Sequence, residues 1–152
     1  MSIETVLLVV GTGEENQIDQ LAEETITVAG PADAEVVVFH AFSDDEFDEV
    51  RSKLGVDEAS EGSSADAVAK RHRTTRELAK ALDEAGVRYS VRGAVGDHAD
   101  EVVSAAKREG ADRVIIGGRN RSPTGKAVFG SAAQEVILTA PCPVTFVRED
   151  AA

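Results

Sequence analysis

The sequence predicts an α/β protein of the doubly wound, Rossmann-like kind: a three-layer sandwich with a five-stranded parallel sheet between two layers of helices. Two observations predict this fold. Five apolar runs of strand length recur along the 152 residues, and helix-like stretches separate them. The runs are apolar on both faces and rich in β-branched residues, as strands buried between two helical layers must be. Because helical crossovers separate the strands, they are expected to pair in parallel.

The predicted strands are residues 5–10 (TVLLVV), 35–42 (EVVVFHAF), 87–93 (VRYSVRG), 113–118 (RVIIGG) and 143–147 (PVTFV). The predicted helices cover residues 14–29, 64–85, 97–110 and 131–139. Gly30-Pro31 is expected to stop the first helix, Gly86 to follow the end of the second, and Asp97 to cap the third. Residues 43–62 hold eight acidic and two basic residues and are predicted to form an irregular, solvated connection.

The composition indicates one domain over residues 1–152 and limits the possible partners. With 28 acidic and 16 basic residues the formal charge is −12, which repels nucleic acid and anionic lipid, so neither is expected as a partner. The acidic excess also suits a salty cytoplasm, and a halophilic protein is predicted, with an ordinary acidic protein as the alternative. The start, MSIETVLLVV, has the pattern of a strand rather than a signal peptide, and a cytoplasmic location is expected.

Residues 117–131, GGRNRSPTGKAVFGS, have the composition of a phosphate-binding loop. The Walker A pattern fails, because Asn120 stands at its first Gly and Ala127 at its metal-binding hydroxyl. Residues 113–134 nevertheless contain four basic residues and no acidic one, and Ser131 opens a helix directly after Gly130. The free N–H groups of a first helical turn bind phosphate well. The alternative is a simple turn and helix cap, in which the basic residues balance the charge of acidic neighbours.

This segment, continued by APCPVTFV, resembles the C-terminal signature of the universal stress protein family, Gly-x2-Gly-x9-Gly-[Ser/Thr]. EVVVFHAF and VGDHADEVVSAAKREGADRVIIGG resemble the family's second strand and its third helix with the fourth strand, so that the resemblance covers the whole chain. It implies the strand order 3-2-1-4-5. It also implies a homodimer that pairs residues 143–147 of two subunits.

The resemblance further implies a site for ATP or another adenine nucleotide, with or without Mg²⁺. Its phosphate positions are Gly117, Gly130, Ser131 and Ala132, and its adenine and ribose positions are Val9, Ala41 and Ile116. Arg121 and Lys126 are expected to supply positive charge.

Two residues depart from the family pattern. Asn120 replaces the second motif Gly, and Gly11 stands where ATP-binding members usually have an Asp. Asn tolerates a positive φ, so the first change is compatible with the turn. The missing carboxylate costs about 1.5–3 kcal/mol if it accepted a hydrogen bond from the nucleotide. Thr12 or Gly13 can offset part of this cost.

Two functions therefore stay open: a nucleotide-binding regulatory domain of a stress response, and a dimeric interaction protein of the same fold that has lost ATP binding. An enzyme is not expected beyond weak ATP hydrolysis, since no carboxylate or His near the loop has the spacing of a general base. No two of His40, His72 and His98 share a metal-ligand spacing, and cap or edge roles are predicted for them. The basic stretch 70–76, KRHRTTR, is predicted to be a solvated helix face.

Overall fold

The structure is a computed structural model and describes residues 3–10, 17–53, 64–118 and 131–148. The strands within these ranges form one sheet of order β3-β2-β1-β4-β5, and all neighbouring strands are parallel. The predicted fold class and strand order are confirmed. The strands are β1 (Thr5–Val10), β2 (Glu35–Phe42), β3 (Tyr89–Val95), β4 (Arg113–Gly118) and β5 (Val144–Arg148). Three have the predicted bounds, while β3 begins two residues and β5 one residue later than predicted.

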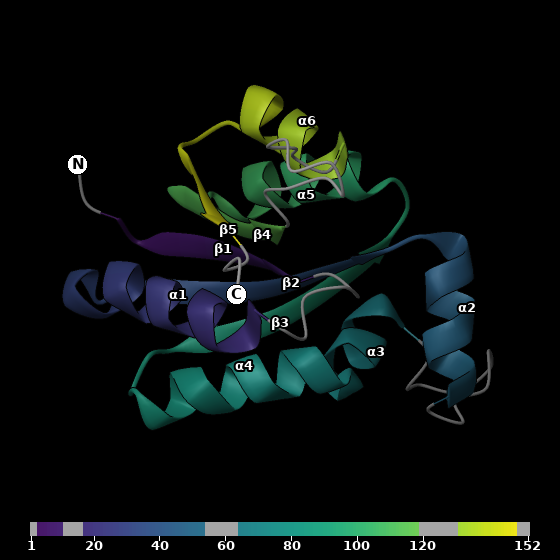
Figure 1. Cartoon of the computed structure of the whole chain (residues 1–152), viewed down its shortest axis with the longest axis horizontal. Coiled ribbons are helices and arrows are strands. Elements are labelled where there is room, and N and C mark those ends of the chain that lie inside the picture. The colour runs from purple at the N-terminus through teal and green to yellow at the C-terminus, as the bar shows by residue number, and fades with distance from the viewer. Residues whose placement is uncertain (1–2, 11–16, 54–63, 119–130, 149–152) are drawn as a thin grey trace, which may run out of the picture.

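Helices cover both faces of the sheet (Figure 1). They are α1 (Ile18–Ala32), α2 (Asp44–Lys53), α3 (Ala65–Arg71), α4 (Arg73–Glu84), α5 (His98–Glu109) and α6 (Ser131–Thr139). Helices α1, α3 and α4 lie on one face, α5 and α6 lie on the other, and α2 stands at one end of the sheet (Figure 1). None of the helices in the described ranges is long and apolar enough to cross a membrane.

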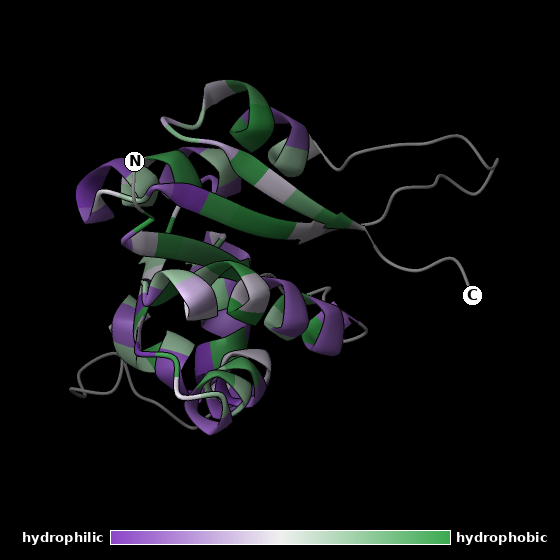
Figure 2. Cartoon of the chain, turned by 90° about the vertical axis from the view of Figure 1, so that its left-hand side faces the viewer, coloured by the Kyte–Doolittle hydropathy of each residue, from purple (hydrophilic) through white to green (hydrophobic). Residues whose placement is uncertain are grey.

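Alternating strand residues form two separate cores. Leu8 and Val38 are buried on the face covered by α1, α3 and α4. Val9 and Phe39 are buried on the face covered by α5 and α6. Figure 2 shows the hydrophobic residues concentrated on the strands and the hydrophilic ones on the outer helices. Burial on both faces explains why these strands are continuously apolar.

The prediction that Gly30-Pro31 stops the first helix was wrong, since α1 continues to Ala32 with Pro31 inside it. The helix ends at Asp33, which adopts the left-handed conformation with φ 53°. The N–H groups of Asp33 and Ala34 donate to the carbonyl oxygens of Gly30 and Ala29, both at 3.0 Å. This pair of bonds closes the last turn as in a Schellman motif. The helix therefore continues past Pro31, although proline has no N–H group to donate.

The single helix predicted over residues 64–85 is two helices. His72 lies between α3 and α4 with an extended backbone, φ −68° and ψ 136°. The ring of His72 meets the ring of buried His40 edge-on, with centroids 4.6 Å apart. This contact joins residues far apart in the sequence, and helical periodicity, which is a local pattern, cannot predict it.

The prediction of an irregular connection over residues 43–62 was also wrong for its first half, where α2 forms. The side chain of Glu46 accepts a hydrogen bond from the N–H of Ser43 at 2.8 Å, and the Ser43 hydroxyl accepts one from the N–H of Glu46 at 3.2 Å. This is a capping box, and its Ser-x-x-Glu signal precedes the apolar residues Phe47 and Val50 in the sequence. In contrast, the predicted cap Asp97 is confirmed, because its carboxylate accepts from the N–H of Asp100 at 3.1 Å.

Candidate nucleotide-binding site

The predicted adenine and ribose positions come together at the carboxyl end of the sheet. Val9 pairs with Ile116 across β1 and β4, and Ala41 lies on the neighbouring strand β2. All three side chains are buried in the core covered by α5 and α6. Ala132, in the first turn of α6, packs against the same core. In doubly wound sheets ligands bind beyond the carboxyl ends of the strands, so these four residues border the expected place for one.

Gly117 faces the opposite side of the sheet from Ile116. A β-carbon on Gly117 would lie 3.0 Å from Oε1 of Gln17 and 3.2 Å from a methyl group of Leu21. The Gln17 side chain is buried, and its Nε2 donates to the carbonyl oxygen of Val147 at 3.0 Å. The space beside Gly117 is therefore occupied by the chain's own side chains. Sequence reasoning missed Gln17, since a Gln at the start of a helix carries no signal of burial.

A depression of about 270 Å³ lies beside Ala132, between the carboxyl ends of β2 and β3 and the first turns of α5 and α6. Its lining residues are Ser43, Gly96, Asp97, His98, Ala99, Ala132 and Glu135. Nε2 of His98 lies 2.6 Å from Oε1 of Glu46, so that this pair links α5 to the capping box of α2. The carboxylates of Asp97 and Glu135 repel phosphate and can accept hydrogen bonds from hydroxyl or amino groups. The depression therefore suits the uncharged part of a nucleotide.

His40 has neither a cap nor an edge role, contrary to the prediction. It is fully buried on β2, and its ring stacks on that of Phe42 with centroids 3.9 Å apart. Neither ring nitrogen has a hydrogen-bond partner in the described part of the chain. Burial, together with a smaller effect of the neighbouring His72, lowers the pKa of His40 to about 3. His40 is thus a neutral core residue at neutral pH.

The remaining predicted site residues are Gly11, Thr12, Asn120, Arg121, Lys126 and Gly130, which lie outside the described residues. Ser131 is the first residue of α6, as predicted. In the ranges that are described, no group of three or more His, Cys, Asp or Glu side chains is placed to hold a metal ion.

Comparisons with known proteins agree with this architecture. A universal stress protein from Mycolicibacterium smegmatis is 38% identical over 68 residues, which are 44% of this chain and 52% of that protein. The matched stretch covers about half or less of each curated relative.

Solved structures match over nearly the whole chain. The structure of the hypothetical protein MJ0577 has a TM-score of 0.73 at 19% identity, with both chains covered completely. A universal stress protein in complex with cAMP has a TM-score of 0.63 at 18% identity and covers 99% of this chain and all of its own. A family protein from Arabidopsis thaliana with AMP bound has a TM-score of 0.64 at 15% identity, over 97% of this chain and 93% of that one.

A family model extends these matches to the sequence as a whole. The model described as the universal stress protein family matches residues 3–148, which include every strand of the sheet and both helical layers. The chain therefore belongs to the universal stress protein family.

Proposed function

We propose that this chain binds an adenine nucleotide and acts as a regulatory domain in a stress response. The observation that carries the proposal is the shared burial of Val9, Ala41 and Ile116 at the carboxyl end of the sheet, beside the start of α6. Small and branched apolar side chains suit a base and sugar, and the first turn of α6 suits phosphate. The AMP and cAMP complexes of structurally similar proteins support this assignment.

Each predicted site residue has a role in this proposal. The proposal assigns the phosphates to Gly130, Ser131, Ala132 and the backbone of Gly117, and positive charge to Arg121 and Lys126. Gly11, Thr12 and Asn120, which follow β1 and β4 in the sequence, are the other residues that it assigns to the site. The base or ribose enters the depression beside His98, where carboxylates exclude the phosphates. When ATP is the ligand, Mg²⁺ accompanies its phosphates.

Calorimetric titration with ATP, with and without Mg²⁺, and with AMP tests the proposal. Replacing Arg121 and Lys126 with Glu should weaken nucleotide binding by at least about 100-fold, because two favourable charges become two repulsive ones. The matched control is Lys107→Glu with Arg108→Glu, which makes the same change of charge on exposed residues of α5. Equal affinities of the two double variants would refute the role of the loop. Absence of binding at millimolar nucleotide would refute the nucleotide proposal itself.

The second candidate is a dimeric interaction protein that binds no ATP. Gly11 in place of the family's Asp favours it, and so does the packing of Gln17 and Leu21 into the space beside Gly117. Its interface is β5, which lies at one edge of the sheet. A chain that fails to bind nucleotide but sediments as a dimer would support this second function.

A further inference from the structure

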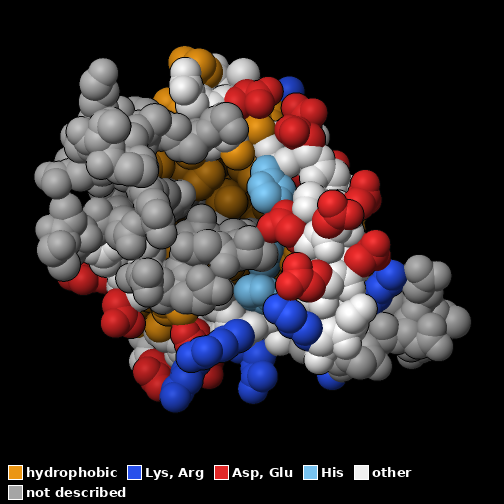
Figure 3. Space-filling view, turned by 45° about the vertical axis from the view of Figure 1, so that its right-hand side comes forward, with side chains coloured by type: hydrophobic (Ala, Val, Ile, Leu, Met, Phe, Trp, Pro, Cys, Tyr) orange, Lys and Arg blue, Asp and Glu red, His pale blue; other side chains and the backbone are white. Residues whose placement is uncertain are grey.

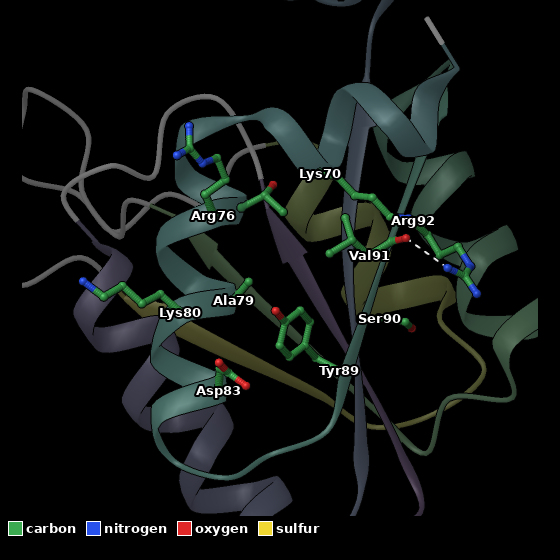
Figure 4. Close-up of a pocket in the computed structure, with 10 residues that line it drawn as sticks. Lys70, Arg76, Ala79, Lys80, Asp83, Tyr89, Ser90, Val91 and Arg92 are labelled. Carbon is green, nitrogen blue, oxygen red and sulfur yellow. Dashed lines mark hydrogen bonds between the residues drawn. The ribbon is translucent and has the colours of Figure 1, made fainter. Parts of the chain in front are cut away.

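A groove of about 620 Å³ lies between α4 and β3 at the edge of the sheet (Figure 4). Ala79 of α4 and Tyr89 and Val91 of β3 form its floor. The groove shares no lining residue with the depression of the proposed nucleotide site. Its volume falls within the range of pockets that bind small molecules.

Basic side chains surround this groove. Arg76 and Lys80 line it from α4, Lys70 lines it from α3, and Arg92 lines it from β3 (Figure 4). Within the described part of the chain, no carboxylate forms an ion pair with Lys70, Arg76 or Lys80. Figure 3 shows Lys and Arg side chains gathered below the histidines on one face of the molecule. A local positive cluster on a chain of formal charge −12 favours an anionic ligand.

One acidic residue limits where such a ligand can lie. Asp83 is the single carboxylate among the lining residues, and Arg92 also lies 3.8 Å from Glu109 of α5. Figure 4 places Asp83 beside Tyr89, at the opposite end of the groove from Lys70 and Arg92. An anion is therefore favoured at the end of the groove where α4 begins.

The first turn of α4 is unusual for a helix. It holds Arg73 and Arg76 and no acidic residue, and it begins at His72 without a side-chain cap. Arg73 pairs with Glu77 at 3.2 Å, whereas the positive charge of Arg76 opposes the helix dipole. Thr75, which lines the groove, is 1% exposed, and its hydroxyl has no hydrogen-bond partner among the described residues. An uncapped basic first turn and a buried hydroxyl without a described partner both lower the stability of the fold, and such features are expected at binding sites.

We propose that this groove is a second anion site, which binds a short, flexible polyphosphate at the start of α4. Lys and Arg are the side chains that recognise phosphate oxygens, through charge-assisted hydrogen bonds. Because Lys70, Arg76 and Lys80 lie along α3 and α4, a flexible chain of phosphates contacts more of them than a single phosphate does. The hydroxyl of Thr75, in the lining, can donate to a phosphate oxygen.

Two other kinds of anion fit the groove less well. An extended acidic peptide would add to the edge of β3, but the carbonyl of Val91 already accepts from Nη1 of Arg92 at 3.0 Å, and the N–H of Gly93 donates to Asp66 at 2.7 Å. A nucleic acid strand needs several aromatic rings for its bases, and Tyr89 is the one aromatic residue in the lining. A long strand would also leave the basic cluster and run over an acidic surface.

The test titrates the full chain with inorganic tripolyphosphate in a background that carries Arg121→Glu and Lys126→Glu, so that the proposed nucleotide loop does not contribute. Tripolyphosphate should bind in this background. Arg76→Ala with Lys80→Ala should weaken binding by at least about tenfold, as expected for two lost charge-assisted contacts. Thr75→Val should weaken it severalfold without lowering the melting temperature, since the hydroxyl has no partner in the protein to lose. Lys107→Ala with Arg108→Ala, an exposed pair on α5, is the charge-matched control and should leave binding unchanged.

Three results would overturn the proposal. The first is absence of binding in the background chain at low salt. The second is equal weakening by the α4 and α5 double variants, which would show an effect of net charge alone. The third is equal or tighter binding of oligoglutamate or single-stranded DNA of the same charge, which would show that phosphate chains are not selected. None of these results bears on the nucleotide proposal, because the background removes that site.

Discussion

The side-chain amide of Gln17 donates a hydrogen bond to the carbonyl oxygen of Val147 and thereby joins the start of α1 to the last strand of the sheet. The other end of the same amide, Oε1, faces the α-carbon of Gly117, where a β-carbon would lie 3.0 Å from it. One buried side chain thus connects a predicted phosphate residue with the strand proposed to form the dimer.

Gly117→Ala is expected to destabilise the chain by about 1–3 kcal/mol, because the new methyl group displaces Gln17. In a Gln17→Ala background the same substitution should cost less, with a coupling energy of about 0.5–3 kcal/mol. Urea denaturation of the two single variants and the double variant measures this coupling. Additive effects would mean that the two residues do not compete for the same space.

Gly93→Ala is expected to destabilise the fold by about 1–3 kcal/mol or more. A β-carbon on Gly93 would lie 2.3 Å from the carbonyl oxygen of Ala65, a backbone atom that cannot move without shifting α3 away from β3. Gly30→Ala is the control, since its β-carbon would meet one side-chain atom at 4.0 Å. Similar losses of stability in the two variants would contradict the close contact between α3 and β3.

His40 should make stability fall as the pH is lowered. Its folded pKa of about 3 lies below the ordinary value of 6.5, so that between these values the unfolded chain binds a proton that the folded chain does not. Its contribution is complete above pH 6.5 and is lost toward pH 3 at up to about 1.4 kcal/mol per pH unit. The charges of His72 and His98 add to this effect of burial, and Glu46 opposes it.

The measurement is the free energy of unfolding of the native chain and of His40→Leu at several pH values between 7 and 4. The Leu variant lacks the titrating group, so its stability should fall less steeply, and the difference between the two curves should grow as the pH falls. Parallel curves would show that His40 does not titrate differently in the folded and unfolded chains.

The proposed dimer can be tested through the alternation of backbone groups along β5. The N–H of Val114 donates to the carbonyl of Pro143 at 3.0 Å, so in a parallel ladder the N–H of Thr145 also points toward β4, and that of Val144 points outward. Val144→Pro should therefore weaken a dimer that pairs two β5 strands. Thr145→Pro should instead destabilise each subunit, because it removes a donor of the internal ladder.

Sedimentation of the two proline variants, combined with their thermal unfolding, separates these effects. We expect Val144→Pro to yield folded monomers, and Thr145→Pro to lower the melting temperature. A native chain that sediments as a monomer would exclude the dimer, and a Val144→Pro variant that stays dimeric would place the interface elsewhere.

The sequence by itself determined the sheet. Runs such as TVLLVV and EVVVFHAF are apolar on both faces, and this local pattern is sufficient to predict a strand between two layers of helices, with β1 and β2 at their observed bounds. The start of α5 could also be predicted from the local sequence, since the cap of Asp97 involves only the next three residues. The burial of Val9, Ala41 and Ile116 follows from the same apolar runs, and their contact with a nucleotide stays a prediction.

The tertiary structure alone decided what depends on residues distant in the sequence. The break at His72 reflects its contact with His40, and the tight space at Gly117 reflects Gln17, a residue 100 positions earlier in the chain. The burial of His40 and the groove beside β3 likewise arise when separate elements pack together. Periodicity and capping signals report neighbours within one or two turns, and contacts across the core form only when the chain has folded.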